Sequence, residues 1–334
     1  MKKFVFKTAL FIIIPALFFG GIYVWTDPFK LLRPFSFQYF DNKNREHQSL
    51  ELLKFNKGKY EYDSFLFGSC RLNSINSYHW KHYLPEGSTP FVFQAWGETI
   101  FGVRQKIDYL AKENYDIRNV LILLDVPGGF LNTESSSDAV TKNYYELSGN
   151  SALEYHWSMA KNIFKPSYMV ECVKEKISSG EQELIFDTVS NDFSISFRKN
   201  WMLEPQKDSL RQSTPQQRED FFNKILIRKE IPEPADLLDE EGRNCLLHIA
   251  EMLKQKNTNV LVIISPNIEY KYPAISESDL LFLKKAFGEE CVYDFSRDDY
   301  LIHDYNCYYD PDHFGCWAGW YIIENIYKQY VGNK

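Results

Sequence analysis

The sequence lacks several features that would place it in a large class of proteins. It has no excess of basic residues, since 38 Lys and Arg stand against 45 Asp and Glu, for a net charge of −7. A nucleic-acid partner is therefore not expected. Six cysteines in 334 residues are too few for a disulfide scaffold. No glycine-rich phosphate loop occurs in the sequence, so nucleotide use is not supported.

Long hydrophobic runs are also scarce, and the one that is present lies at the amino terminus. It covers residues 8–26 without a charge and follows Lys2, Lys3 and Lys7. About 20 apolar residues span a bilayer as a helix, and flanking lysines stay on the cytoplasmic side. The alternative is a cleaved signal peptide, but no clear cleavage site follows the run. We therefore expect residues 1–26 to be a single-pass signal anchor in the cell membrane, with the rest of the chain extracytoplasmic.

Beyond this run, the pattern changes to short apolar stretches that alternate with helical periodicities. We interpret residues 27–60, which are polar and aromatic, as a juxtamembrane connection, and residues 61–334 as one domain. Strands are predicted at 64–67, 91–93, 120–124, 260–264 and 291–295. Between them, apolar residues recur at helical spacing, as at Val103, Ile107 and Leu110. Buried strands that alternate with amphipathic helices predict an α/β fold around a parallel five-stranded sheet.

One interval, at about 131–240, does not fit this alternation. It contains serine-rich and proline-containing stretches, and it also has segments with helical spacing, such as residues 152–164. We interpret it as a mostly helical insertion between the third and fourth strands. An insertion at that position emerges at one end of the sheet, where it would form a lid or a platform for a substrate.

The first candidate catalytic motif is Gly68-Ser69-Cys70-Arg71, directly after the predicted strand at 64–67. In open α/β sheets, binding sites form at the carboxyl ends of the strands. A nucleophile at the start of the following helix lies beside backbone N–H groups and the helix dipole, which stabilise an oxyanion. The alternative is a strand-to-helix turn that merely ends in small residues.

The second candidate motif is Asp310-x-x-His313, shortly before the predicted final helix. An Asp and a His at this spacing can share one loop, in which the carboxylate orients the imidazole as in a catalytic triad. Asp312 lies between them and is the less favoured orienter. The alternative is a surface turn or a helix cap. Cys307 and Cys316 flank the loop, and they either form a disulfide or stay free.

Together, a Gly-x-nucleophile turn after the first strand and an Asp-x-x-His before the last helix resemble the SGNH (GDSL-type) hydrolase superfamily. The similarity covers roughly residues 62–334, with 131–240 poorly matched. It is strongest to the membrane-anchored branch with the D-alanyl transfer protein of lipoteichoic acid biosynthesis and the alginate O-acetylation proteins. The resemblance implies a flavodoxin-like three-layer sandwich. It also implies acyl transfer or ester hydrolysis on a cell-surface polysaccharide, with an acylated donor, a surface glycan acceptor and a multi-span membrane O-acyltransferase as partner.

The resemblance also assigns roles to individual residues. The family's first motif is Gly-x-Ser with its third residue as nucleophile, and Cys70 holds that position here. His313 corresponds to the base and Asp310 to its orienter. The backbone N–H groups of Cys70 and Gly97 correspond to the oxyanion hole. Many members supply a further Asn from the third strand, and the nearest candidate here, Asn132, lies slightly downstream.

Two further residues flank the predicted nucleophile. Ser69 occupies the middle position of the turn and is expected to support the loop. Arg71 either binds an anionic group of the substrate, favours the thiolate, or forms a structural ion pair. We expect no metal and no cofactor. His79 and His82 would share a helix face, but the sequence offers no identifiable third ligand.

The sequence leaves a second function open. A cysteine in place of serine and a missing third-strand Asn are also the marks of a decayed site. In that case the domain is a non-catalytic binding or scaffold partner of a membrane O-acyltransferase. For the catalytic interpretation, a thioester is a good acyl donor, so Cys70 is chemically adequate for transfer.

Overall fold

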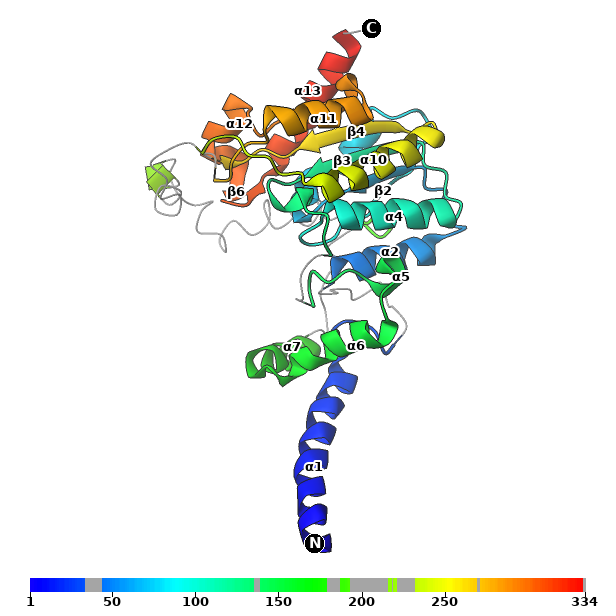
Figure 1. Cartoon of the computed structure of the whole chain (residues 1–334), viewed down its shortest axis with the longest axis vertical. Helices are drawn as coiled ribbons and strands as arrows, with labels where there is room; N and C mark the ends of the chain where they lie inside the picture. The colour runs from blue at the N-terminus through cyan, green and yellow to red at the C-terminus, as the bar shows by residue number, and fades with distance from the viewer. Residues whose placement is uncertain are drawn as a thin grey trace.

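A long helix, α1 (Lys2–Thr26), projects from the rest of the molecule (Figure 1). The computed structural model describes residues 1–33, 44–134, 139–178, 187–192, 216–217, 219–220, 232–268 and 271–332. The apolar window of α1 has a mean hydropathy of 2.1, and none of it is buried in the protein. The predicted amino-terminal helix is thus present, and it is long and apolar enough to cross a membrane.

The core of the domain is a sheet of five parallel strands, as predicted. The strands are β1 (Ser64–Phe67), β2 (Pro90–Val92), β3 (Asn119–Leu124), β4 (Asn259–Ile264) and β5 (Val292–Asp294). Each lies within one residue of its predicted bounds. Their order in the sheet is β2-β1-β3-β4-β5. The order reverses between β1 and β3, and such a switch point is where doubly wound sheets bind ligands, beyond the carboxyl ends of the strands.

The two faces of the sheet are covered by two separate hydrophobic clusters. Successive side chains of a strand point to opposite faces. In β3, Val120 and Ile122 accordingly enter one cluster, whereas Leu121 and Leu123 enter the other. Buried residues of the first cluster come from α2 (Arg45–Asn56), α4 (Ile100–Lys112), α10 (Glu240–Gln255) and α11 (Glu277–Phe287). Those of the second come from α3 (Ser77–Lys81), α12 (Asp299–His303) and α13 (Cys316–Gly332).

The segment 27–60, which we expected to be a juxtamembrane connection, contains α2. This helix begins after Asn44, whose side chain accepts a hydrogen bond from the backbone N–H of His47. Leu50 and Leu53 are fully buried in the first cluster. The packed domain therefore begins before residue 61. Sequence analysis passed over α2 because several of its polar residues are buried as well, so it shows no clear apolar stripe.

The interval between β3 and β4 is helical over much of its described part, in agreement with the prediction. It contains α5 (Tyr145–Ser148), α6 (Ala152–Ala160), the 3-10 helix η3 (Lys161–Phe164) and α7 (Pro166–Ser178). Residues 187–192 then lie along the edge strand β2, where the backbone N–H of Val92 donates to Ser190 O (2.8 Å). The pairing covers an otherwise open sheet edge. Residues 179–186 and most of 193–231 of the predicted insertion lie outside the described residues.

Candidate active site

Cys70 is the first residue of a short 3-10 helix, η1 (Cys70–Ser74), at the carboxyl end of β1. The hydroxyl of Ser69 caps this helix by accepting a hydrogen bond from the backbone N–H of Arg71 (3.2 Å). The backbone N–H of Cys70 donates no hydrogen bond to any described residue, as is usual in the first turn of a helix. The Cys70 sulfur therefore lies beside a free N–H that can stabilise an oxyanion.

His313 and Asp310 lie on a two-stranded antiparallel hairpin, β6 (Tyr308–Asp310) and β7 (His313–Phe314). The turn is stabilised by Asp310 Oδ1, which accepts the backbone N–H groups of Asp312 (2.7 Å) and His313 (2.9 Å). The same carboxylate bonds the ring, with Oδ2 at 2.9 Å from His313 Nδ1. Asp310 thus fixes both the backbone and the imidazole of His313.

The second nitrogen of the imidazole ring, Nε2, lies beside the thiol of Cys70. Cys70 Sγ lies 3.0 Å from His313 Nε2, although the two residues are 243 positions apart. The structure therefore brings Cys70, His313 and Asp310 into one hydrogen-bonded series. The carboxylate of Asp312 takes no part in it and contacts Lys271 and the hydroxyl of Tyr272 (3.2 Å) instead.

The charges of this series depend on one another. The hydrogen bond from Asp310, followed by that from Cys70, raises the pKa of His313 from 6.5 to about 10, and partial burial opposes the rise. Burial pushes the pKa of Asp310 upward, but its hydrogen bonds with the His313 ring and with two backbone N–H groups leave it below its usual value. At neutral pH, a protonated imidazole thus lies between an ionised carboxylate and the sulfur.

Two contacts hold the hairpin against the nucleophile turn. The hydroxyl of Ser74, the last residue of η1, donates to the carbonyl oxygen of Phe314. In α13, Gly319 packs so closely on η1 that an added Cβ would lie 1.9 Å from the carbonyl oxygen of Ser74. Sequence analysis missed both residues. A glycine inside a helix is a weak signal of close packing, and Ser74 carries no signal by itself.

Next to Cys70, a cluster of polar side chains connects the carboxyl ends of three strands, β1, β3 and β4. The hydroxyl of Ser69 donates to Asp125, which directly follows β3. Arg71 Nη1 donates to Ser265 Oγ (2.7 Å) after β4, and it lies 3.7 Å from Asp125 Oδ1. The Arg71 side chain is only 7% exposed. Of the roles considered for Arg71, the structure contains the ion pair. Asp125 was also missed, although its position at the end of a predicted strand could have identified it.

Gly97 lies in the loop after β2, which is tied to the nucleophile turn by a hydrogen bond from Ala95 N to Gly68 O (3.2 Å). Its φ of 62° is in the left-handed region that glycine adopts at little cost. Among the described residues, the Gly97 N–H donates no hydrogen bond, and neither Gly97 nor Asn132 contacts Cys70 through one. The structure thus ties the Gly97 loop to the nucleophile turn through Ala95, and shows no hydrogen bond from Gly97 itself to Cys70.

A buried charge network anchors this loop. Lys106 of α4 is fully buried and pairs with Glu98, directly after Gly97, and with Glu46 of α2 (2.7 Å). Burial raises the pKa of Glu98 to about 7. Burying charge is costly unless every group is paired, so this network ties the loop to α2 and α4. Sequence analysis offered no signal for it.

Other side chains considered from the sequence lie elsewhere. Cys307 and Cys316 do not form a disulfide with each other, and the other four cysteines form none either. The ring of His79 lies against those of Tyr83 (5.5 Å between centroids) and Trp320 (5.8 Å). In the part of the chain that the structure describes, no group of three or more metal-ligating side chains occurs.

No family model and no curated protein sequence matches the chain. The geometry of the site itself is therefore the basis for a functional interpretation. A thiol, an imidazole and a carboxylate in hydrogen-bonded series, at the switch point of a parallel sheet, form an arrangement able to carry out nucleophilic catalysis.

Proposed function

We propose that this protein is a membrane-anchored acyltransferase or esterase with Cys70 as nucleophile, His313 as acid and base, and Asp310 as its orienter. The observation that carries the proposal is the 3.0 Å separation of Cys70 Sγ and His313 Nε2, in series with the 2.9 Å bond to Asp310. A nucleophile within hydrogen-bond reach of a base, which a third group orients in turn, is the diagnostic arrangement of covalent acyl transfer.

In the first half-reaction, His313 Nε2 holds the proton of the Cys70 thiol, and the thiolate sulfur attacks the carbonyl carbon of an acyl ester and forms a C–S bond. The negative charge moves to the carbonyl oxygen, where the backbone N–H groups of Cys70 and Gly97 would bind it. When the oxyanion collapses, the C–O bond to the donor breaks. His313 gives its Nε2 proton to the departing alkoxide, which leaves as an alcohol, and the acyl group remains as a thioester on Cys70.

In the second half-reaction, the roles of His313 reverse. Acylation removes the hydrogen bond and the electrostatic interaction with the Cys70 sulfur, which are among the causes that raise the pKa of His313. The neutral imidazole then takes the proton of an acceptor hydroxyl as that oxygen attacks the thioester carbon. The C–S bond breaks and the sulfur leaves as a thiolate, beside a newly protonated His313. A sugar hydroxyl as acceptor gives transfer, and water gives hydrolysis.

The proposal extends to the fold and the location. The strand order β2-β1-β3-β4-β5 is that of flavodoxin-like sheets, which favours an SGNH-type three-layer domain. We assign α1 as a single-pass anchor with its lysines in the cytoplasm and the domain outside. The resemblance in the sequence motifs suggests an acylated donor, a surface glycan acceptor and a multi-span O-acyltransferase as partner.

The direct test is to trap the acyl-enzyme. The full-length protein in detergent is incubated with 4-nitrophenyl acetate, and its intact mass and the release of nitrophenol are measured. We expect one acetyl group on the wild type and none on Cys70→Ala. Cys291→Ala is the matched control, because Cys291 is also a partly exposed cysteine outside any disulfide but ends the 3-10 helix η5 (Glu289–Cys291), directly before β5. Equal acetylation of wild type and Cys70→Ala would favour the scaffold function instead.

A further inference from the structure

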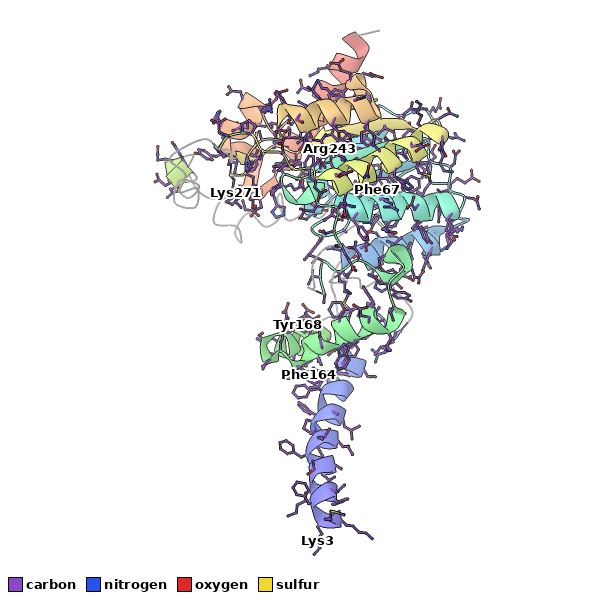
Figure 2. All side chains as sticks on the ribbon, in the orientation of Figure 1. Lys3, Phe67, Phe164, Tyr168, Arg243 and Lys271 are labelled. Carbon is purple, nitrogen blue, oxygen red and sulfur yellow. The ribbon has the colours of Figure 1, made fainter. Side chains whose placement is uncertain are left out.

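The helices α6, η3 and α7 form a layer across the end of α1, between α1 and the sheet (Figure 1). On one side of this layer, the ring of Phe164 lies 5.1 Å from that of Phe19 in α1. On the other side, Tyr168 stacks on Phe29 at 6.1 Å. Figure 2 shows Phe164 on the side of α1 and Tyr168 on the side of the sheet domain.

This layer exposes large apolar side chains to its surroundings. Their exposed fractions are Leu153 81%, Trp157 63%, Phe164 51%, Val170 46% and Ile177 72%. Leu153 and Trp157 are four residues apart on α6, and Val170 and Ile177 are seven apart on α7, so each pair shares one face of its helix. Large exposed apolar side chains gathered in one layer of this kind mark an interaction site.

The contact with Phe19 fixes the depth of this surface relative to α1. Phe19 follows Lys7 by 12 residues, which is about 18 Å along a helix, and precedes Thr26 by seven, which is about 10 Å. The hydrocarbon core of a bilayer is about 30 Å thick. If α1 spans the membrane from Lys7 onward, Phe19 lies inside the hydrocarbon, and Phe164 beside it lies at the same apolar depth.

The charges next to Phe164 suit the boundary of a bilayer. Lys161 and Lys165 flank Phe164 at the two ends of η3, and both are exposed. Lysines extend their apolar stems along a membrane surface and place their ammonium groups among the headgroups. Apolar and aromatic side chains combined with lysines are typical of helices that lie in the interface of an anionic membrane.

We propose that α6, η3 and α7 are an interfacial platform, which inserts its exposed apolar side chains into the outer leaflet around α1. The occupant of this surface is lipid, since the contact of η3 with Phe19, seven residues before the end of α1, gives it no aqueous solvent once α1 spans the bilayer. The inference rests on the proposed membrane span of α1 and not on the chemistry of Cys70. Its consequence is a sheet domain held at a fixed height above the membrane.

The test is photo-crosslinking of the full-length protein in vesicles of phosphatidylethanolamine and phosphatidylglycerol. A photoreactive benzophenone amino acid replaces Trp157 or Phe164, and lipid adducts are measured by mass spectrometry. Leu281 of α11 is the matched control, because its 63% exposure equals that of Trp157 but it lies in the sheet domain. Phe11, which is 80% exposed in α1, is the positive control.

We expect lipid adducts at 157 and 164 to exceed those at 281 by about ten-fold, since labelling follows the local density of acyl chains. Labelling at 157 and 164 as weak as at 281 would overturn the platform, and so would crosslinks to a second copy in place of lipid. If position 11 is not labelled, α1 does not span the bilayer, and both the membrane span and the platform are overturned. Acetylation of Cys70, measured in the same vesicles, tests the proposed chemistry separately.

Discussion

Gly319 lies against the backbone of Ser74 so closely that an added Cβ would be 1.9 Å from the Ser74 carbonyl oxygen. Ser74 ends the helix that Cys70 begins, and Gly319 belongs to the helix that follows His313. This approach therefore joins the two elements that carry the thiol and the imidazole. Because a misplacement of about 1 Å can cost about 10²-fold in rate, we expect the packing of these two small residues to position the site.

The first prediction concerns this packing. Gly319→Ala should slow acetylation of Cys70 by about 10²-fold, because α13 must move away from η1 and carry the hairpin with it. The measurement is the rate of nitrophenol release, with thermal unfolding recorded in parallel. Gly128→Ala is the control, since an added Cβ there meets nothing within 4 Å. An unchanged rate in Gly319→Ala would show that the contact does not position the site.

The second prediction separates the two adjacent residues of the turn. Cys70→Ala should lose on the order of 10⁴-fold in acyl transfer. Ser69→Ala should keep substantial activity but lose about 1 kcal/mol of stability, because it removes the cap of η1. Cys70→Ser should retain part of the activity, since His313 can also activate a hydroxyl. If only Ser69→Ala lost its activity, Ser69 and not Cys70 would be the nucleophile.

The third prediction is a pH dependence of stability. The imidazole of His313 has a pKa of about 10 in the folded protein and about 6.5 when unfolded, so the folded state binds more protons between these values. Its stabilising contribution is complete below pH 6.5 and is lost as the pH rises toward 10. Urea unfolding at several pH values should show this decline. Asp310→Asn should flatten it, and a slope equal to that of the wild type would contradict the role of Asp310.

The fourth prediction concerns the buried ion pair of Arg71 and Asp125. Each single variant, Arg71→Met or Asp125→Asn, should destabilise the protein by about 3 kcal/mol, because a buried charge is left without its partner. The double variant should lose less than the sum, by about 1–3 kcal/mol of coupling. Urea unfolding of the four proteins measures this. Strict additivity would mean that the two side chains do not stabilise each other.

The sheet could be predicted from sequence because its strands are nearly continuous apolar runs, as buried parallel strands must be. The helix α2 could not, since it buries Glu46 beside the fully buried Lys106, and only the folded structure shows that the two are paired. A sequence pattern reports hydrophobic burial well, but it carries little information about buried polar residues that are partnered across the fold.

The candidate site likewise has residues that the sequence predicts and residues that it does not. Topology alone predicts that a residue after β1 and one before α13 meet at the carboxyl edge of the sheet, and Cys70 and His313 do so. Ser74 and Gly319 hold the two elements together by contacts with backbone oxygens of Phe314 and Ser74, and the residue type alone does not indicate such contacts in a sequence. The chemistry of the site therefore has a sequence signature, whereas its positioning has none. The catalytic roles themselves stay predictions.

The separation of Cys70 and His313 by 243 positions in the chain also has a consequence in time. At the usual pace of synthesis, about 5–20 residues per second, the cysteine leaves the ribosome about 12–50 seconds before the histidine. During that interval Cys70 has neither its partner nor the helix that packs on its turn. The newborn chain therefore carries Cys70 without His313 throughout this interval, and the hydrogen bond between the thiol and the imidazole forms only after His313 has emerged.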